Sequence, residues 1–64
     1  MHKVKILYTN WKGVTRERTI EPIEISFKAT EWHKEPTWIL DATDIEKNEV
    51  RGFAVKDIHS WNEI

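Results

Sequence analysis

Alternating hydrophobic and polar residues predict that the chain begins with a β-hairpin. Between positions 3 and 9, Val4, Ile6 and Tyr8 recur with a period of two, which places their side chains on one face of a strand. The segment Asn10–Gly13 is typical of a hairpin turn, in which Gly13 would supply a positive φ. We therefore expect this strand to turn back on itself after Thr9.

The second extended run, Thr15–Lys28, changes its hydrophobic phase partway along. Ile20 lies at an even position, whereas Ile25 and Phe27 lie at odd positions. Pro22 falls between the two phases, and proline favours strand edges and bulges because it has no N–H to donate. The pattern predicts one long strand that bends sharply near Pro22 and contributes to two sheet surfaces.

Two further strands and a closing segment follow a loop over residues 29–37. Strands are expected at Thr37–Thr43 and at Glu49–Val55, separated by a polar turn. In the last segment, the spacing of Ile58 and Trp61 fits a helical turn, a 3₁₀ turn or a short irregular strand. We expect an all-β fold: a small SH3-like or Sm-like barrel, closed on itself, of four to five strongly bent antiparallel strands with little or no helix.

Length and composition narrow the classes of protein. The 64 residues allow a single domain, 1–64. The absence of cysteine excludes disulfides and thiolate chemistry. The longest apolar runs have three residues, far below the roughly 20 that a membrane span needs. The formal net charge of −1 excludes a strongly basic nucleic-acid binder. With no signal-peptide pattern, a cytoplasmic protein without a membrane partner is expected.

Four tryptophans are many for a chain of this length. Large aromatic side chains supply much of the buried area that a small domain needs, so we expect at least two of the four in the core. Trp38 is expected there, although one face of its ring could also line a pocket. Trp11, beside the turn glycine, is expected to be partly exposed, either packed over the hairpin or serving as a stacking platform.

Several short segments follow one another in a recognisable order along almost the whole chain. They are Tyr8, Gly13, Arg18–Pro22, Trp38–Ala42, Arg51–Val55 and Asp57–Ile58. Over roughly residues 4–58, this order resembles the WYL domain, a small Sm-like β-barrel of bacterial and phage regulators. The sequence departs from the family pattern at Ile39, where the name-giving triplet has tyrosine, and at Asp57, where arginine is usual. Relatives usually carry the domain behind a helix-turn-helix, which this chain does not contain, so a stand-alone module is expected.

The resemblance implies a non-catalytic regulatory module that senses an anionic ligand, with single-stranded nucleic acid as the leading candidate. The residues that match the family's basic and aromatic pocket are Arg18, Trp38 and Arg51, with Tyr8 and Phe53 at its margin. No cofactor is implied.

The spacing of the cationic residues is compatible with the function that the resemblance implies. Arg16 and Arg18 share one face of a strand by the period-two rule, and Lys12 lies in the turn before them. Arginine captures phosphate or carboxylate with two parallel hydrogen bonds and stacks on bases. Alternatively, these arginines pair with glutamates across strands on an ordinary solvated face. The predicted ligand site consists of Arg18, Arg51, Trp38, Arg16, Lys12 and Tyr8.

Other chemistry finds little support in the sequence. In the loop 29–37, His33 is a single imidazole without the paired spacing of a metal site, so no metal is expected. Trp32 and His33 instead form a candidate partner-binding loop. The adjacent pair His59–Ser60 does not give triad geometry, and no phosphate-binding glycine loop is present, so an enzyme is not expected.

Two functions remain open from the sequence. If the four cations Lys12, Arg16, Arg18 and Arg51 converge without acidic partners, binding of single-stranded nucleic acid or a nucleotide is favoured. If glutamates interleave with them, a protein-interaction or oligomerisation module with a protein partner or a second copy is favoured. The glutamates in question are Glu17, Glu21, Glu24 and Glu49.

Overall fold

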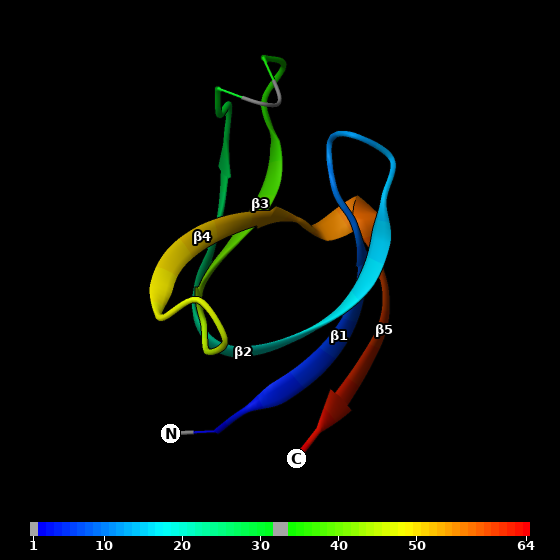
Figure 1. Ribbon diagram of the computed structural model, residues 1–64. Helices are drawn as coiled ribbons and strands as arrows, with labels where there is room; N and C mark the ends of the chain where they lie inside the picture. The colour runs from blue at the N-terminus through cyan, green and yellow to red at the C-terminus, as the bar shows by residue number, and fades with distance from the viewer. Residues whose placement is uncertain (1, 32–33) are drawn as a thin grey trace.

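The computed structural model describes residues 2–31 and 34–64, and these form an all-β fold. Five strands and one 3₁₀ turn follow each other: β1 (Val4–Thr9), β2 (Thr15–Lys28), β3 (Thr37–Asp44), β4 (Glu49–Ala54), η1 (Val55–Asp57) and β5 (Ile58–Glu63). Figure 1 shows them along the chain. The predicted strands are confirmed, and the closing segment combines two of the alternatives considered for it, a 3₁₀ turn followed by a strand. Among the described residues, no helix has the length and apolar character needed to cross a bilayer.

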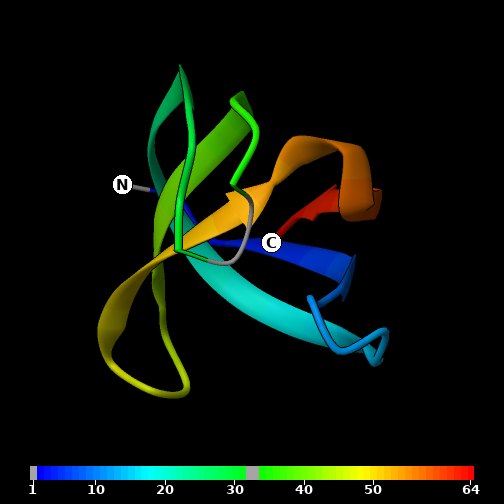
Figure 2. The ribbon, with the colours of Figure 1, turned by 90° about the horizontal axis from the view of Figure 1, so that it is seen from above.

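All strand pairs are antiparallel, and the single sheet has the order β4-β3-β2-β1-β5. The sheet curves strongly (Figures 1 and 2), so that its two outer strands, β4 at the left and β5 at the right of Figure 1, face each other across the molecule. These two strands are joined through η1, but within the described part of the chain they form no ladder with each other. The predicted small, strongly bent β-fold is therefore present, but the expected closure of the sheet is not seen in the described residues, where β4 and β5 are the outer strands.

The bend in β2 explains its change of hydrophobic phase. The first half of the strand pairs with β1, from Thr15 to Ile20, and the second half pairs with β3. Between Pro22 and Glu24 the register shifts, which marks a β-bulge. The extra residue switches the parity, so that odd positions after the bulge lie on the same face as even positions before it. The prediction of a sharp bend near Pro22 is thus confirmed.

The core lies on the concave face of the curved sheet. It consists of Val4, Ile6, Tyr8, Ile20, Leu40, Ala42 and Phe53, with Ile58 packed against it. Alternation in β1 directs its three members inward, as predicted. On the other face, the register partners Ile39 and Ala54 are also buried. Gly13 has a φ of 83°, so the turn after β1 uses the left-handed conformation expected of it.

The expected burial of the tryptophans is wrong. Trp11, Trp38 and Trp61 are 52%, 55% and 48% exposed, so at least two core tryptophans are excluded whatever the environment of the fourth. For Trp38 the predicted face is right, because it alternates with Leu40. However, β4 pairs with β3 only from Ile39 onward, so Trp38 lies past the end of the neighbouring strand. Smaller aliphatic side chains, with Tyr8 and Phe53, fill the core instead.

Candidate anion-binding site

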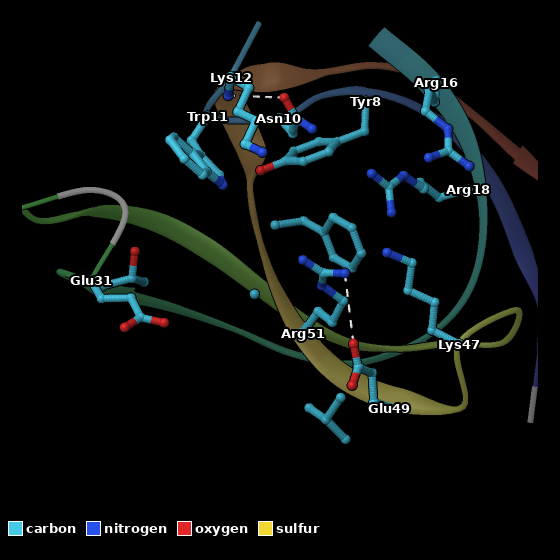
Figure 3. Close-up of a pocket in the computed structure, with 14 residues that line it drawn as sticks. Tyr8, Asn10, Trp11, Lys12, Arg16, Arg18, Glu31, Lys47, Glu49 and Arg51 are labelled. Carbon is cyan, nitrogen blue, oxygen red and sulfur yellow. Dashed lines mark hydrogen bonds and ion pairs between the residues drawn. The ribbon is translucent and has the colours of Figure 1, made fainter. Parts of the chain in front are cut away.

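A cleft of about 610 Å³ opens between the β1–β2 hairpin and β4 (Figure 3). This volume is within the range of roughly 300–1,000 Å³ that small-molecule sites occupy. The lining comes from the two hairpins, from β4 and from the start of the loop after β2. The lining residues are Tyr8, Asn10, Trp11, Lys12, Arg16, Arg18, Thr30, Glu31, Lys47, Glu49, Val50, Arg51, Gly52 and Phe53.

The cleft is positively charged although the chain is not. Its five cations are Lys12, Arg16, Arg18, Lys47 and Arg51, and its two carboxylates are Glu31 and Glu49. Five positive and two negative charges give the lining +3, against −1 for the whole chain. Such a concentration of one sign in a concave surface raises the local concentration of anions.

Strand register explains why the cations meet here. In β2, Arg16 and Arg18 continue the row that Ile20 begins, and Arg18 is the direct partner of Ile6 in β1. In β4, Arg51 lies opposite the core residue Ala42. Directly opposed residues of antiparallel strands share a face. The basic residues therefore occupy the concave face beyond the edge of the apolar core.

Arg18 forms the floor of the cleft and is almost completely buried, at 6% exposure. Its Nη1 lies 3.4 Å from Oδ2 of Asp44, which is 1% exposed. This is long for a charge-assisted hydrogen bond, which is typically about 2.7–2.9 Å. The buried Nε of Arg18 has no partner. A guanidinium has five N–H donors, so Arg18 keeps donors for an acceptor within the cleft.

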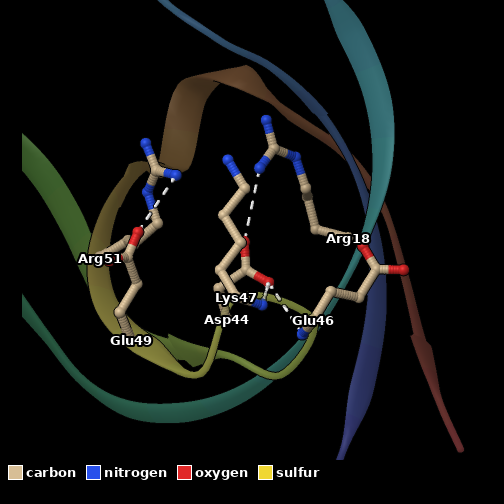
Figure 4. Close-up of polar contacts among 6 residues, drawn as sticks. All are labelled: Arg18, Asp44, Glu46, Lys47, Glu49 and Arg51. Carbon is tan, nitrogen blue, oxygen red and sulfur yellow. Dashed lines mark hydrogen bonds and ion pairs between the residues drawn. The ribbon is translucent and has the colours of Figure 1, made fainter.

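Asp44 connects this arginine to the turn between β3 and β4 (Figure 4). Its Oδ1 accepts hydrogen bonds from the backbone N–H groups of Glu46 and Lys47, at 3.1 and 3.3 Å. One carboxylate thus orders the turn with one oxygen and holds Arg18 with the other. The ordered turn places the Lys47 side chain between those of Arg18 and Arg51 (Figure 4). Three neighbouring cations repel one another in the free protein, and a bound anion would relieve this repulsion.

Arg51 is held only weakly by its own partner. Its Nη1 is 3.7 Å from Oε1 of Glu49, and both side chains are more than a third exposed. An exposed ion pair of this kind contributes little to stability and is easily exchanged. Arg51 is therefore available to an anion that enters the cleft.

Tyr8 supplies a neutral donor beside the cations. Its hydroxyl oxygen accepts a hydrogen bond from the backbone N–H of Ala54, at 3.1 Å, and its ring packs edge-to-face on Phe53, with centroids 4.9 Å apart. Burial raises the pKa of the Tyr8 phenol above its ordinary value of 10.0. The hydrogen bond from the Ala54 N–H lowers this pKa and the negative charge of Asp57 raises it, but burial has the largest effect. The phenol is therefore protonated at neutral pH, and its proton is directed away from the Ala54 N–H that donates to it.

The hairpin tip forms the rim of the cleft. Oδ1 of Asn10 accepts hydrogen bonds from the backbone N–H groups of Lys12 and Val14, at 2.9 and 3.0 Å. This side-chain cap, together with Gly13, fixes the turn. The turn presents Trp11 and Lys12 at the rim, where the Lys12 Nζ lies 5.2 Å from the centre of the Trp11 ring.

Five of the six predicted ligand-site residues line this one cleft: Tyr8, Lys12, Arg16, Arg18 and Arg51. Trp38 is not among the lining residues; it packs edge-to-face on Phe27, with centroids 5.3 Å apart, on the arm formed by β2 and β3. Ile39, which replaces the family's tyrosine, also lies outside the lining, so this replacement removes no group from the cleft. The predicted partner-binding residues Trp32 and His33 lie outside the described residues.

Some lining residues had little or no signal in the sequence. Lys47 reaches the cleft because the β3–β4 register and the hydrogen bond to Asp44 fold its turn back. No short sequence motif predicts this fold of the turn. Trp11 was a candidate for stacking because of its place beside a turn glycine, and it lines the cleft, whereas Trp38 and Trp61 do not. In the described part of the chain, no three histidine or carboxylate side chains cluster in a way that would hold a metal ion.

The family model described as WYL domain matches residues 1–63. No curated protein and no solved structure matches the chain.

Proposed function

This chain belongs to the WYL domain family, and from that premise we propose that it is a non-catalytic regulatory module that binds an anionic ligand in the basic cleft. The ligand we propose is single-stranded nucleic acid or a nucleotide. The observation that carries the proposal is Arg18, a buried guanidinium with unused donors at the floor of a cleft with a net positive lining.

The distribution of acidic residues favours nucleic acid over a mixed-charge protein interface. Of the four glutamates that could have interleaved with the cations, Glu17, Glu21 and Glu24 are not part of the lining. Glu49 is, and it makes only a long contact with Arg51. With Glu31, the lining holds two carboxylates against five cations, so an excess of positive charge is left for a ligand.

The residues suggest a division of labour in binding. A phosphate would accept hydrogen bonds from Arg18 on the floor and from Arg51 and Lys47 beside it, and charge-assisted bonds of this type are roughly twice as strong as neutral ones. The Tyr8 hydroxyl would donate to a phosphate or sugar oxygen. A base would stack on Trp11 at the rim, which is one of the two roles that the sequence predicts for this tryptophan. Aromatic stacking is tolerant of base identity, so we expect weak sequence preference.

The test is the fluorescence anisotropy of a labelled random single-stranded oligonucleotide titrated with the protein at low and high salt. Binding should weaken steeply with salt, with a slope of log K against log[salt] of about −0.7 for each phosphate neutralised. The variant Arg18→Met/Asp44→Asn/Arg51→Gln removes both guanidinium groups of the cleft and leaves no buried carboxylate without its partner, so it should stay folded and lose binding. The control, Lys5→Gln/Lys56→Gln, removes two exposed cations that lie outside the cleft.

The two variants separate the outcomes. Loss of binding in the cleft variant alone supports the proposal. Equal weakening in both variants would indicate nonspecific attraction to the whole surface and contradict it. A flat titration at both salts, with oligonucleotide and with a nucleoside monophosphate, would exclude nucleic acid and nucleotides as ligands.

A further inference from the structure

The second half of β2 and the first half of β3 form a two-stranded arm that projects beyond the rest of the sheet (Figure 1). Its large apolar side chains are Ile23, Ile25, Phe27 and Trp38, and each is more than half exposed. Ile25 and Phe27 lie opposite Leu40 and Trp38, so these side chains continue the face that forms the core. Clustered exposed apolar side chains on a small domain mark an interaction surface.

The same arm has a free strand edge. Pairing between β1 and β2 ends at Ile20, and from Glu21 to Lys28 the strand pairs with β3 alone. Within residues 2–31 and 34–64, no strand covers the other edge of this segment. Unpaired backbone groups along such an edge are a template for another strand. Pro22 and the bulge limit this template to the segment beyond them.

The sequence of the free edge is complementary to itself. When two copies of the segment are placed antiparallel about a two-fold axis at Ser26, Ile25 of one copy faces Phe27 of the other. Glu24 then faces Lys28, and by symmetry this ion pair occurs twice. Opposite charges and apolar pairs directly across an antiparallel ladder both stabilise it.

Other registers lose this complementarity. A slip by one residue would put the apolar side chains of the two copies on opposite faces. Centring the axis on Ile25 places Glu24 opposite Ser26, and centring it on Phe27 places Lys28 opposite Ser26. Only the axis at Ser26 opposes Glu24 to Lys28 while keeping all apolar side chains on one face.

We propose that this arm is a homodimer interface, in which the β2 segments of two copies pair antiparallel about Ser26. The occupant is a second copy of this chain because both the charge pattern and the apolar pattern are self-complementary, as a two-fold interface requires. In the free chain, Lys28 already contacts Asp41, with Nζ 2.7 Å from Oδ2. The Glu24 carboxylate of the second copy would therefore join a lysine that is already held in place. None of these residues lines the basic cleft, so the inference does not depend on the proposed ligand.

The experiment is sedimentation equilibrium of the whole chain from about 10 μM to about 1 mM, a range that suits the weak association expected of a small interface. The wild type should dimerise, and Glu24→Lys and Lys28→Glu should each raise the dimer Kd about tenfold or more, because like charges then face each other at two places. Mixing the two variants should restore dimers, since the heterodimer has an opposite-charge pair at both places.

Two further variants test the apolar face and the folding of the chain. Ile25→Lys should abolish dimers, whereas Ile64→Lys, at a more exposed apolar position outside the arm, should not. Far-UV circular dichroism of each variant checks that it is folded. A wild type that is monomeric at every concentration would overturn the proposal. Dimers that survive Ile25→Lys, or charge variants that mixing does not rescue, would also contradict it.

Discussion

Replacing the two members of the buried Arg18–Asp44 pair should separate their roles in stability and in binding. Three variants are needed: Arg18→Met, Asp44→Asn and the combination of both. Each single change leaves a charge buried without its partner, because the two residues are 6% and 1% exposed. Breaking a buried ion pair in this way costs about 3–5 kcal/mol when its geometry is good.

The geometry lowers this figure. The 3.4 Å contact between Nη1 and Oδ2 is long, and Asp44 keeps its two hydrogen bonds to the turn after Arg18 is removed. We therefore expect each single variant to lose about 2–3 kcal/mol of unfolding free energy. For a domain of this size, that corresponds to a fall in Tm of about 10–20 °C. The double variant should be close to the wild type, because methionine fills the space and asparagine retains an acceptor for the turn.

Binding should follow a different pattern. Hydrogen bonds to charged groups contribute about 1.5–3 kcal/mol, so loss of the Arg18 guanidinium should weaken oligonucleotide binding roughly 10- to 100-fold. Asp44→Asn retains Arg18 and should bind at least as well as the wild type when both are folded. Urea unfolding at low temperature measures stability, and anisotropy at the same temperature measures affinity.

Two results would refute this reasoning. If both single variants are as stable as the wild type, the buried pair has no measurable coupling and Asp44 serves the turn alone. If Arg18→Met binds the oligonucleotide like the wild type, the floor of the cleft does not contact the ligand. The double variant is the control for folding, because it should be stable and yet bind weakly.

Three further predictions concern single groups. The pKa of the Tyr8 phenol is raised by burial, so the folded protein holds this proton more tightly than the unfolded chain does, and the resulting stability is complete below pH 10 and is lost as the pH rises above it. Because the chain has one tyrosine, phenolate absorbance measures the ionisation of this group directly, with Tyr8→Phe as the control. Gly13→Ala should cost about 1 kcal/mol in urea unfolding, because φ is 83° there although an added Cβ would contact nothing; a neutral effect would contradict the left-handed turn. Glu49→Gln should strengthen oligonucleotide binding a few-fold at low salt, because it removes a carboxylate from the lining and frees Arg51; unchanged affinity would place the ligand elsewhere.

The strands could be predicted because alternation and turn residues act locally. Val4, Ile6 and Tyr8 define the inner face of β1 without reference to any other strand, and Asn10 and Gly13 define the turn that follows. The exposure of Trp38 could not be predicted in this way. Periodicity assigns a side chain to a face, but whether that face is covered depends on where the neighbouring strand begins, which is a matter of long-range register.

The candidate site likewise has residues that the sequence predicts and residues that depend on the fold. That Arg16 and Arg18 lie side by side followed from the period of two, and that Arg51 joins them was implied by the family resemblance. The parts that escaped prediction are those set by the fold of the turn, where Asp44 holds Arg18 and orders the backbone that carries Lys47. A carboxylate at a strand end has no sequence signal that distinguishes this double role from ordinary exposure.

One strand, β2, carries both of the surfaces proposed for this protein. Along its inner face, the residues before Ile20 are arginines of the cleft and the residues after the bulge are the apolar side chains of the arm. Only Ile20, at the centre, is fully buried in the core. None of the apolar side chains of the arm lines the cleft, so a second copy paired to the arm would replace no lining residue. Dimerisation would then place two basic clefts in one particle without altering either, and a strand of nucleic acid long enough to reach both would bind more tightly than its single-site affinity predicts.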